Sequence, residues 1–210
     1  MIKVKVCGNL DPVNASAVAS AGPDMMGFIF YRGSKRFVGD PPAALWEAVP
    51  ASIEKVGVFV DEDLQKVREL ILRYGFSMVQ LHGNETAVYC GQLRKAGIGV
   101  IKSFGMGASF DFGRLLPYMQ ACDYFLFDTA SPEHGGSGRK FNWKVLKDYS
   151  LEVPFFLGGG IGPSDLHDIL AIGNDRLFAV DINSRFESAP GIKQAGLVKQ
   201  FIHDIKSLQQ

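Results

Sequence analysis

Short apolar runs alternate with amphipathic segments along the whole sequence, and this alternation constrains the fold more than any other feature. Eight runs are predicted as strands, at residues 3–7, 25–30, 55–60, 78–81, 99–104, 124–128, 155–158 and 178–182. Because these runs are apolar almost throughout, they indicate a parallel sheet covered on both faces. Helices are predicted between them, at residues 12–20, 42–48, 63–74, 86–96, 112–119, 143–148, 164–171 and 194–208.

Eight strand–helix units in 210 residues predict a (β/α)₈ barrel, or TIM barrel, formed by residues 1–210 as a single domain. The alternative is an open doubly wound sheet, which normally needs only about five or six strands. Closure accommodates eight parallel strands more readily because it removes both sheet edges. The sequence contains no linker or low-complexity tract that would indicate a second domain.

The composition excludes several kinds of partner. The 22 basic and 22 acidic residues balance, so no basic field favours nucleic acid. No apolar stretch reaches the roughly 18 residues of a membrane span, and the first residues lack the pattern of a signal peptide, so we expect a cytoplasmic protein without a membrane partner. The three cysteines, Cys7, Cys90 and Cys122, are widely spaced, which predicts reduced thiols, no disulfide and no metal site.

Two reactive side chains close predicted strands. Cys7 ends the first run, directly before Gly8, and Asp128 ends the sixth run. The carboxyl ends of barrel strands carry the chemistry of this fold, so both side chains are candidates for the active site. A buried thiol is more often an ordinary core residue, and an aspartate at a strand end can be a turn or cap residue.

Glycines and small polar residues follow strands six, seven and eight. Glycine lets backbone N–H groups approach an anion closely, and the loops after strands seven and eight are the usual phosphate site of a barrel. These loops therefore predict a phosphate-bearing small-molecule ligand. The candidate binding residues are Gly136, Gly138, Gly158, Gly159, Asp181, Asn183 and Ser184.

Seven ordered motifs give the chain a family resemblance. They are KVCG around Cys7, GFIFYRGSKRFV (27–38), VGVFVDE (56–62), VQLHGNE (79–85), FLFDT with GGSGRKFNW (125–143), FFLGGGIGPSDL (155–166) and VDINSRFESAPGIK (180–193). From residue 3 to residue 202 the chain resembles phosphoribosylanthranilate isomerases of tryptophan biosynthesis. It departs from the family pattern at Asn9-Leu10 and at Asn183-Ser184-Arg185, where Ser-Ser-Gly is commoner.

The resemblance implies an Amadori rearrangement of a phosphosugar, N-(5-phosphoribosyl)anthranilate, without cofactor or metal. Asp128 would act as general acid at the ring oxygen and Cys7 as general base at C2′. By the same resemblance, Arg36 would bind the anthranilate carboxylate, because a planar guanidinium can donate two parallel hydrogen bonds to a carboxylate. His82 ends the fourth run, where it either lines the pocket or packs as a cap.

Alternatives remain at this point. The chain could instead be another sugar-phosphate barrel. One such enzyme is a histidine-pathway isomerase, which has an aspartate where Cys7 stands. The others are indoleglycerol-phosphate synthase, which uses a lysine at the rim, and thiamine-phosphate synthase. Here Lys102 lies inside the fifth run rather than at its end. A non-catalytic phosphosugar-binding barrel is a further alternative, although binding alone requires neither Cys7 nor Asp128. Monomer and homodimer both remain open.

Overall fold

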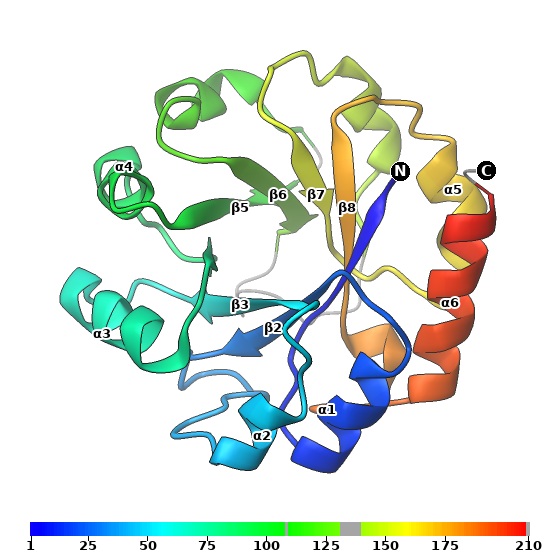
Figure 1. Ribbon diagram of the computed structural model, residues 1–210. Helices are drawn as coiled ribbons and strands as arrows, with labels where there is room; N and C mark the ends of the chain where they lie inside the picture. The colour runs from blue at the N-terminus through cyan, green and yellow to red at the C-terminus, as the bar shows by residue number, and fades with distance from the viewer. Residues whose placement is uncertain (108, 131–139, 209–210) are drawn as a thin grey trace.

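Eight parallel strands close into a barrel in the computed structural model, which describes residues 1–107, 109–130 and 140–208 (Figure 1). The strands are β1 (Lys3–Val6), β2 (Met25–Ile29), β3 (Glu54–Phe59), β4 (Met78–Leu81), β5 (Gly99–Met106), β6 (Tyr124–Thr129), β7 (Phe155–Leu157) and β8 (Leu177–Ile182). Neighbours in the barrel follow chain order, and β8 pairs back onto β1. The predicted (β/α)₈ barrel is therefore confirmed, and the open doubly wound sheet is excluded.

Helices cover the outside of the barrel (Figure 1). They are α1 (Pro12–Ala19), α2 (Ala43–Glu47), α3 (Leu64–Tyr74), α4 (Ala87–Lys95), α5 (Leu166–Leu170) and α6 (Ala195–Ser207). Capping side chains explain where three of them begin: Asp11, Asp63 and Thr86 each accept a backbone N–H of the following first turn. Among the described residues, none of the helices is both long and apolar enough to cross a lipid bilayer.

Three predicted helices differ from the expectation. Two are 3₁₀ helices, η1 (Phe112–Tyr118) and η2 (Trp143–Asp148), and the third divides into η3 (Pro163–Asp165) and α5. In η1, Pro117 lacks the N–H that a continuing α-helix would need. The region after β8 also holds unpredicted structure, namely η4 (Ser184–Phe186) and an antiparallel hairpin of β9 (Glu187–Ala189) and β10 (Ile192–Lys193). These elements are too short for a periodic pattern to reveal them.

The barrel interior changes from apolar to polar along the strands. One apolar layer consists of Met25, Val56, Met78, Ile101, Leu126, Phe156 and Ala179. Because side chains on one strand face repeat every second residue, the next layer toward the carboxyl ends starts two positions later. On four of these strands that position holds Gln80, Ser103, Asp128 or Asp181. The apolar layer therefore closes one end of the barrel and supports a polar site at the other.

A second core fills the space between strands and helices, and aromatic rings form much of it. Phe30 stacks on Phe59 with ring centroids 5.4 Å apart, and Trp46 of α2 packs edge-on against Phe28 at 4.6 Å. Such ring pairs add to the stabilisation from burial. This outer core fixes each helix against its strand, so the loops at the strand ends have defined positions.

Leu126→Ala tests the apolar layer inside the barrel. Leu126 is fully buried, and the truncation leaves a cavity that the closed barrel cannot collapse, so we expect a loss of about 2–5 kcal/mol in the free energy of unfolding. Leu116, which is 56% exposed on η1, provides the control variant Leu116→Ala. Urea unfolding followed by circular dichroism measures both. Equal stability of the two variants would contradict a packed barrel interior.

Candidate active site

A cavity of about 560 Å³ lies at the carboxyl end of the barrel, and most of the predicted site residues line it. Cys7, Arg36, His82, Asp128, Gly159, Asp181, Asn183 and Ser184 all contribute to its wall. Gly158 is buried and directly precedes the cavity-lining Gly159 in the chain. Gly136 and Gly138 lie outside the described residues. A larger, more open groove of about 1060 Å³ lies between α4 and η1 on the outside of the barrel, away from these side chains.

Cys7 continues β1 beyond its last assigned residue. Its backbone N–H donates to Ile182 O at 2.9 Å, which extends the pairing with β8, and only 4% of the residue is exposed. The following turn is held by Asn9, whose amide donates to Val6 O at 2.8 Å and Gly27 O at 3.1 Å. Asn9, one of the departures from the family pattern, is therefore a structural residue that fixes the base of the site. Burial raises the pKa of the Cys7 thiol, and the charge of Lys5 opposes that shift.

Lys5 is a site residue that the sequence reasoning missed. Its ammonium lies inside the barrel, donates to Asp181 Oδ1 at 2.9 Å and is 0% exposed. The available signal was a lysine between two valines inside a predicted strand. A charge at such a position is retained only with a partner, so the neighbouring strand had to supply a carboxylate.

Asp128 faces His82 across the rim. The His82 Nε2 and Asp128 Oδ2 atoms are 3.3 Å apart, and the side chain of each is 16% exposed. The other carboxylate oxygen accepts the N–H of Thr129 at 2.7 Å. On the far side of the ring, Gln80 Nε2 lies 2.8 Å from His82 Nδ1. With the amide N–H directed at Nδ1, the ring carries its hydrogen on Nε2 and donates it to Asp128. His82 thus lines the pocket and contacts the candidate acid, and Gln80 is a further residue that sequence reasoning missed.

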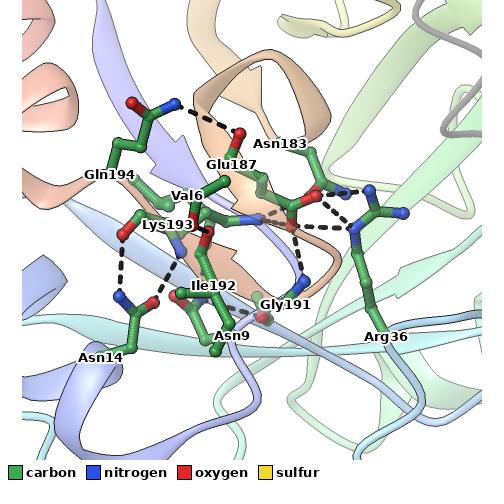
Figure 2. A network of polar contacts seen from close by, with 12 residues as sticks. Val6, Asn9, Asn14, Arg36, Asn183, Glu187, Gly191, Ile192, Lys193 and Gln194 are labelled. Atoms are coloured by element: carbon green, nitrogen blue, oxygen red, sulfur yellow. Dashed lines mark hydrogen bonds and ion pairs between the residues drawn. The ribbon is translucent and has the colours of Figure 1, made fainter.

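Arg36 lies in a buried charge network rather than alone at the rim (Figure 2). Glu187 of β9 accepts from Arg36 Nε at 2.9 Å and from Nη2 at 2.5 Å. The same carboxylate accepts from Lys193 Nζ at 2.5 Å and from the N–H of Gly191 at 3.0 Å. Lys193 Nζ also donates to Asn183 Oδ1 at 2.7 Å. The network holds two cations and one carboxylate, so it leaves one positive charge at the cavity wall.

The sequence motif at 180–193 contained Glu187 and Lys193, but their role depends on the hairpin that brings them back beside Arg36. Arg36 donates to Glu187 with the side of its guanidinium fork that carries Nε. This leaves the Nη1/Nη2 edge available for a second planar carboxylate. Burial alone would raise the pKa of Glu187, but the hydrogen bonds and charges of Arg36 and Lys193 outweigh it and lower this pKa.

The glycine loop after β7 approaches β6 very closely. Gly159 has φ 83°, and a Cβ there would lie 2.6 Å from the Thr129 backbone nitrogen and 2.9 Å from Asp128 Oδ1. A side chain at this position would therefore displace the candidate acid as well as the loop. Asn183, in contrast, directs its amide oxygen to Lys193 rather than outward, so its side-chain carbonyl belongs to the Arg36 network.

The structure also bears on the rival barrels. Lys102 Nζ donates to the carbonyl oxygens of Gly83 at 2.8 Å and Ser103 at 2.9 Å, and it pairs with Glu85 at 3.2 Å. Its position is structural and it does not line the cavity, so Lys102 is not the rim lysine that an indole-forming synthase uses. Within the described part of the chain, no three His, Cys, Asp or Glu side chains converge as metal ligands.

Glu187→Gln tests the buried network through stability. Removing one partner of a buried ion pair typically costs about 3–5 kcal/mol, and here it leaves two cations together. The pKa of Glu187 is lower in the folded than in the unfolded state, so its stabilisation is complete above the ordinary glutamate pKa and is lost as pH falls through the folded value. The difference in unfolding free energy between wild type and variant should therefore shrink from pH 7 toward pH 3. The control is Glu152→Gln at an exposed position. A difference independent of pH would contradict the ionised network.

Comparison with known proteins agrees with these features. The family model of N-(5'-phosphoribosyl)anthranilate (PRA) isomerase matches residues 4–204. An N-(5'-phosphoribosyl)anthranilate isomerase from Phocaeicola vulgatus is 40% identical over 203 residues, covering 97% of each chain. The crystal structure of phosphoribosyl anthranilate isomerase from Thermotoga maritima has a TM-score of 0.87 at 33% identity, covering 99% of this chain and 100% of that one. Another, in complex with reduced 1-(o-carboxyphenylamino)-1-deoxyribulose 5-phosphate, has a TM-score of 0.82 at 30% identity with the same coverage. The chain belongs to the N-(5'-phosphoribosyl)anthranilate isomerase family.

Proposed function

We propose that this protein catalyses the Amadori rearrangement of N-(5-phosphoribosyl)anthranilate to 1-(2-carboxyphenylamino)-1-deoxyribulose 5-phosphate, with Asp128 as general acid and Cys7 as general base. The observation that carries the proposal is the presence of this thiol and this carboxylic acid in one cavity with an arginine. The membership of the chain in the isomerase family supports the reaction. The crystal complex of a relative with a reduced product analogue supports the class of substrate.

The two groups divide the reaction between them. Asp128 gives its proton to the furanose ring oxygen, the bond from that oxygen to C1′ breaks, and the anthranilate nitrogen forms an iminium. Cys7, as thiolate, removes the proton from C2′, and the electron pair moves to give an enolamine. Proton return to C1′ and loss of the proton from the C2′ hydroxyl yield the ketone, so the atoms balance without an external reactant.

His82 completes the acid. In the free protein, the His82 Nε2 hydrogen and the Thr129 N–H both point at the Asp128 carboxylate. The ring opening needs a proton on Asp128, and His82 is placed to share that proton with it.

Arg36 suits the anthranilate carboxylate. Glu187 holds the guanidinium by its Nε side, so the outer edge is fixed in direction before substrate arrives. The positive charge left over in the Arg36, Glu187 and Lys193 network favours an anion at this wall of the cavity. A planar carboxylate fits both features, because it accepts two charge-assisted hydrogen bonds from the fixed guanidinium edge and balances the remaining positive charge.

The phosphate is proposed to bind between the loops after β7 and β8. Gly159 and Gly160 both have positive φ, at 83° and 69°, and they line the cavity together with Ser184. Backbone N–H groups in such turns form concave anion sites. The N–H of Gly162 is already bonded to Asp165 Oδ2 at 2.6 Å, so the proposed site uses the residues before it. Gly136 and Gly138 remain predicted contributors to the substrate site.

Turnover of freshly made phosphoribosylanthranilate, followed by loss of its fluorescence, tests the reaction and both catalytic residues. Cys7→Ser substitutes a hydroxyl that barely ionises at neutral pH, so kcat should fall by about 10²–10⁴ with little change in KM. Asp128→Asn should lower kcat at least about a hundredfold and remove one limb of a bell-shaped pH profile. Cys90→Ala, at a buried thiol remote from the cavity, is the control. Wild-type turnover in either catalytic variant would remove that residue from the mechanism.

Arg36→Met tests the carboxylate contact. The change keeps the apolar stem and leaves Glu187 paired with Lys193, so the fold should persist, while kcat/KM should fall by an amount equivalent to about 2–5 kcal/mol. The corresponding aniline derivative of ribose 5-phosphate lacks the carboxylate, and its turnover should respond much less to the variant. Arg32→Met, at an exposed arginine nearby, serves as the matched control. Equal losses with both substrates would indicate that Arg36 has a purely structural role.

A further inference from the structure

The most unusual buried group near the proposed base is the ammonium of Lys5. Lysine is rarely fully buried, because removing its charge from water costs several kcal/mol without a partner. Lys5 is 0% exposed and belongs to the barrel interior, and it does not line the cavity. Its location therefore excludes contact with substrate and points to an action on a neighbouring side chain.

Two side chains contact the Lys5 ammonium. Asp181 Oδ1 accepts from Nζ at 2.9 Å, and the sulfur of Cys7 lies close enough to interact with the ammonium charge. All three residues are consecutive neighbours on the inner face, since Lys5 and Cys7 are two positions apart on one strand and Lys5 pairs with Asp181 in the β1–β8 register. The ammonium thus lies between one carboxylate and the thiol.

Gly27 on the adjoining strand creates the space for this arrangement. A Cβ at residue 27 would lie 2.8 Å from Cys7 Sγ and 3.1 Å from Lys5 Nζ, both closer than ordinary packing allows. The sulfur and the ammonium therefore occupy the volume that any larger residue at this position would fill. This shape supports a specific pairing of the two groups rather than an incidental proximity.

We propose that Lys5 is a positioning residue that stabilises the Cys7 thiolate by donating an ammonium N–H to its sulfur, and that Asp181 anchors Lys5 for this purpose. The inference rests on the proposed function, in which Cys7 acts as thiolate base. Lys5 remains protonated throughout, because the proton from C2′ goes to sulfur and returns from there. The Lys5 hydrogen bond is then strong while the sulfur is charged and weak once it is protonated.

The charges around Cys7 give this role a definite sign. Lys5 and Lys193 oppose the increase that burial causes in the pKa of the thiol, and Asp181 reinforces that increase. Arg36 also lies close enough to interact with the thiolate charge, and His82 and Asp128 act on Asp181 from across the barrel. Lys193 is already held by Glu187 and Asn183, whereas Lys5 Nζ and Cys7 Sγ both border the space at Gly27, so Lys5 is the cation placed to donate to the sulfur. Removing Lys5 should therefore raise the pKa of the Cys7 thiol, and removing the Asp181 charge should lower it.

The test measures thiolate formation in the free protein, so it requires no turnover. The rate of alkylation by iodoacetamide is followed from pH 6 to pH 11, and Cys7→Ser identifies the signal of Cys7 against the buried Cys90 and Cys122. Lys5→Met should raise the pH of half-maximal rate by about one unit or more and slow alkylation about tenfold at pH 7. Asp181→Asn should lower the same midpoint. Lys3→Met, at the exposed start of the same strand and far from the sulfur, should leave it unchanged.

The outcomes separate this inference from the proposed function. A wild-type midpoint in folded Lys5→Met would overturn the role of Lys5 while leaving the reaction untouched, and midpoints shifted alike in Lys5→Met and Asp181→Asn would indicate a merely structural pair. If Lys5→Met fails to fold, Lys5→Met/Asp181→Asn removes both charges, and its midpoint should lie above those of wild type and Asp181→Asn. A midpoint at or below the wild-type value in the double variant would likewise overturn the proposal.

Discussion

Closure of the sheet is the constraint on which the rest of this molecule depends. In a closed parallel barrel every strand has two neighbours and one inner face, so the two-residue period of each strand decides which side chains meet inside. Here that period places an apolar layer around Leu126 and then, one step toward the carboxyl ends, Gln80, Ser103, Asp128 and Asp181. The site is polar because the second layer of inward-facing side chains carries these polar groups. The apolar first layer beneath it closes the barrel to water from the other end.

Buried charge at the site is compensated in groups rather than singly. Lys5 pairs with Asp181, and Glu187 lies between Arg36 and Lys193. A single unpaired ion in this interior would shift its ionisation or destabilise the fold, whereas in these groups the opposite charges offset part of that cost and the hydrogen bonds fix the side-chain directions. The guanidinium edge and the thiol therefore face the cavity in fixed orientations, which is the requirement for electrostatic preorganisation.

The sequence supported some of these conclusions much better than others. Strand periodicity and length predicted the barrel, and the positions of Cys7 and Asp128 at run ends predicted where they meet, because parallel strands share one carboxyl edge. Periodicity could not reveal the β9–β10 hairpin, since each strand is too short, and without the hairpin Glu187 had no visible link to Arg36. Lys5 was visible as a lysine between two valines of a predicted strand, but the direction of its side chain depended on register across the β1–β8 closure. Gln80 and its contact with His82 needed side-chain geometry that no pattern encodes.

The long sequence separations within the site have a consequence for the order in which the molecule assembles. Arg36 meets Glu187 across 151 residues, Lys5 meets Asp181 across 176, and the amide of Asn14 binds the backbone of Lys193 across 179. Contacts of such separation carry a large loop-closure cost and are slow to form. During synthesis the first strands leave the ribosome long before β8 and its hairpin are made. Until then, Lys5 lacks Asp181 and Arg36 lacks Glu187. The pairing of β8 with β1 therefore closes the barrel and, in the same step, gives Lys5 and Arg36 their carboxylate partners.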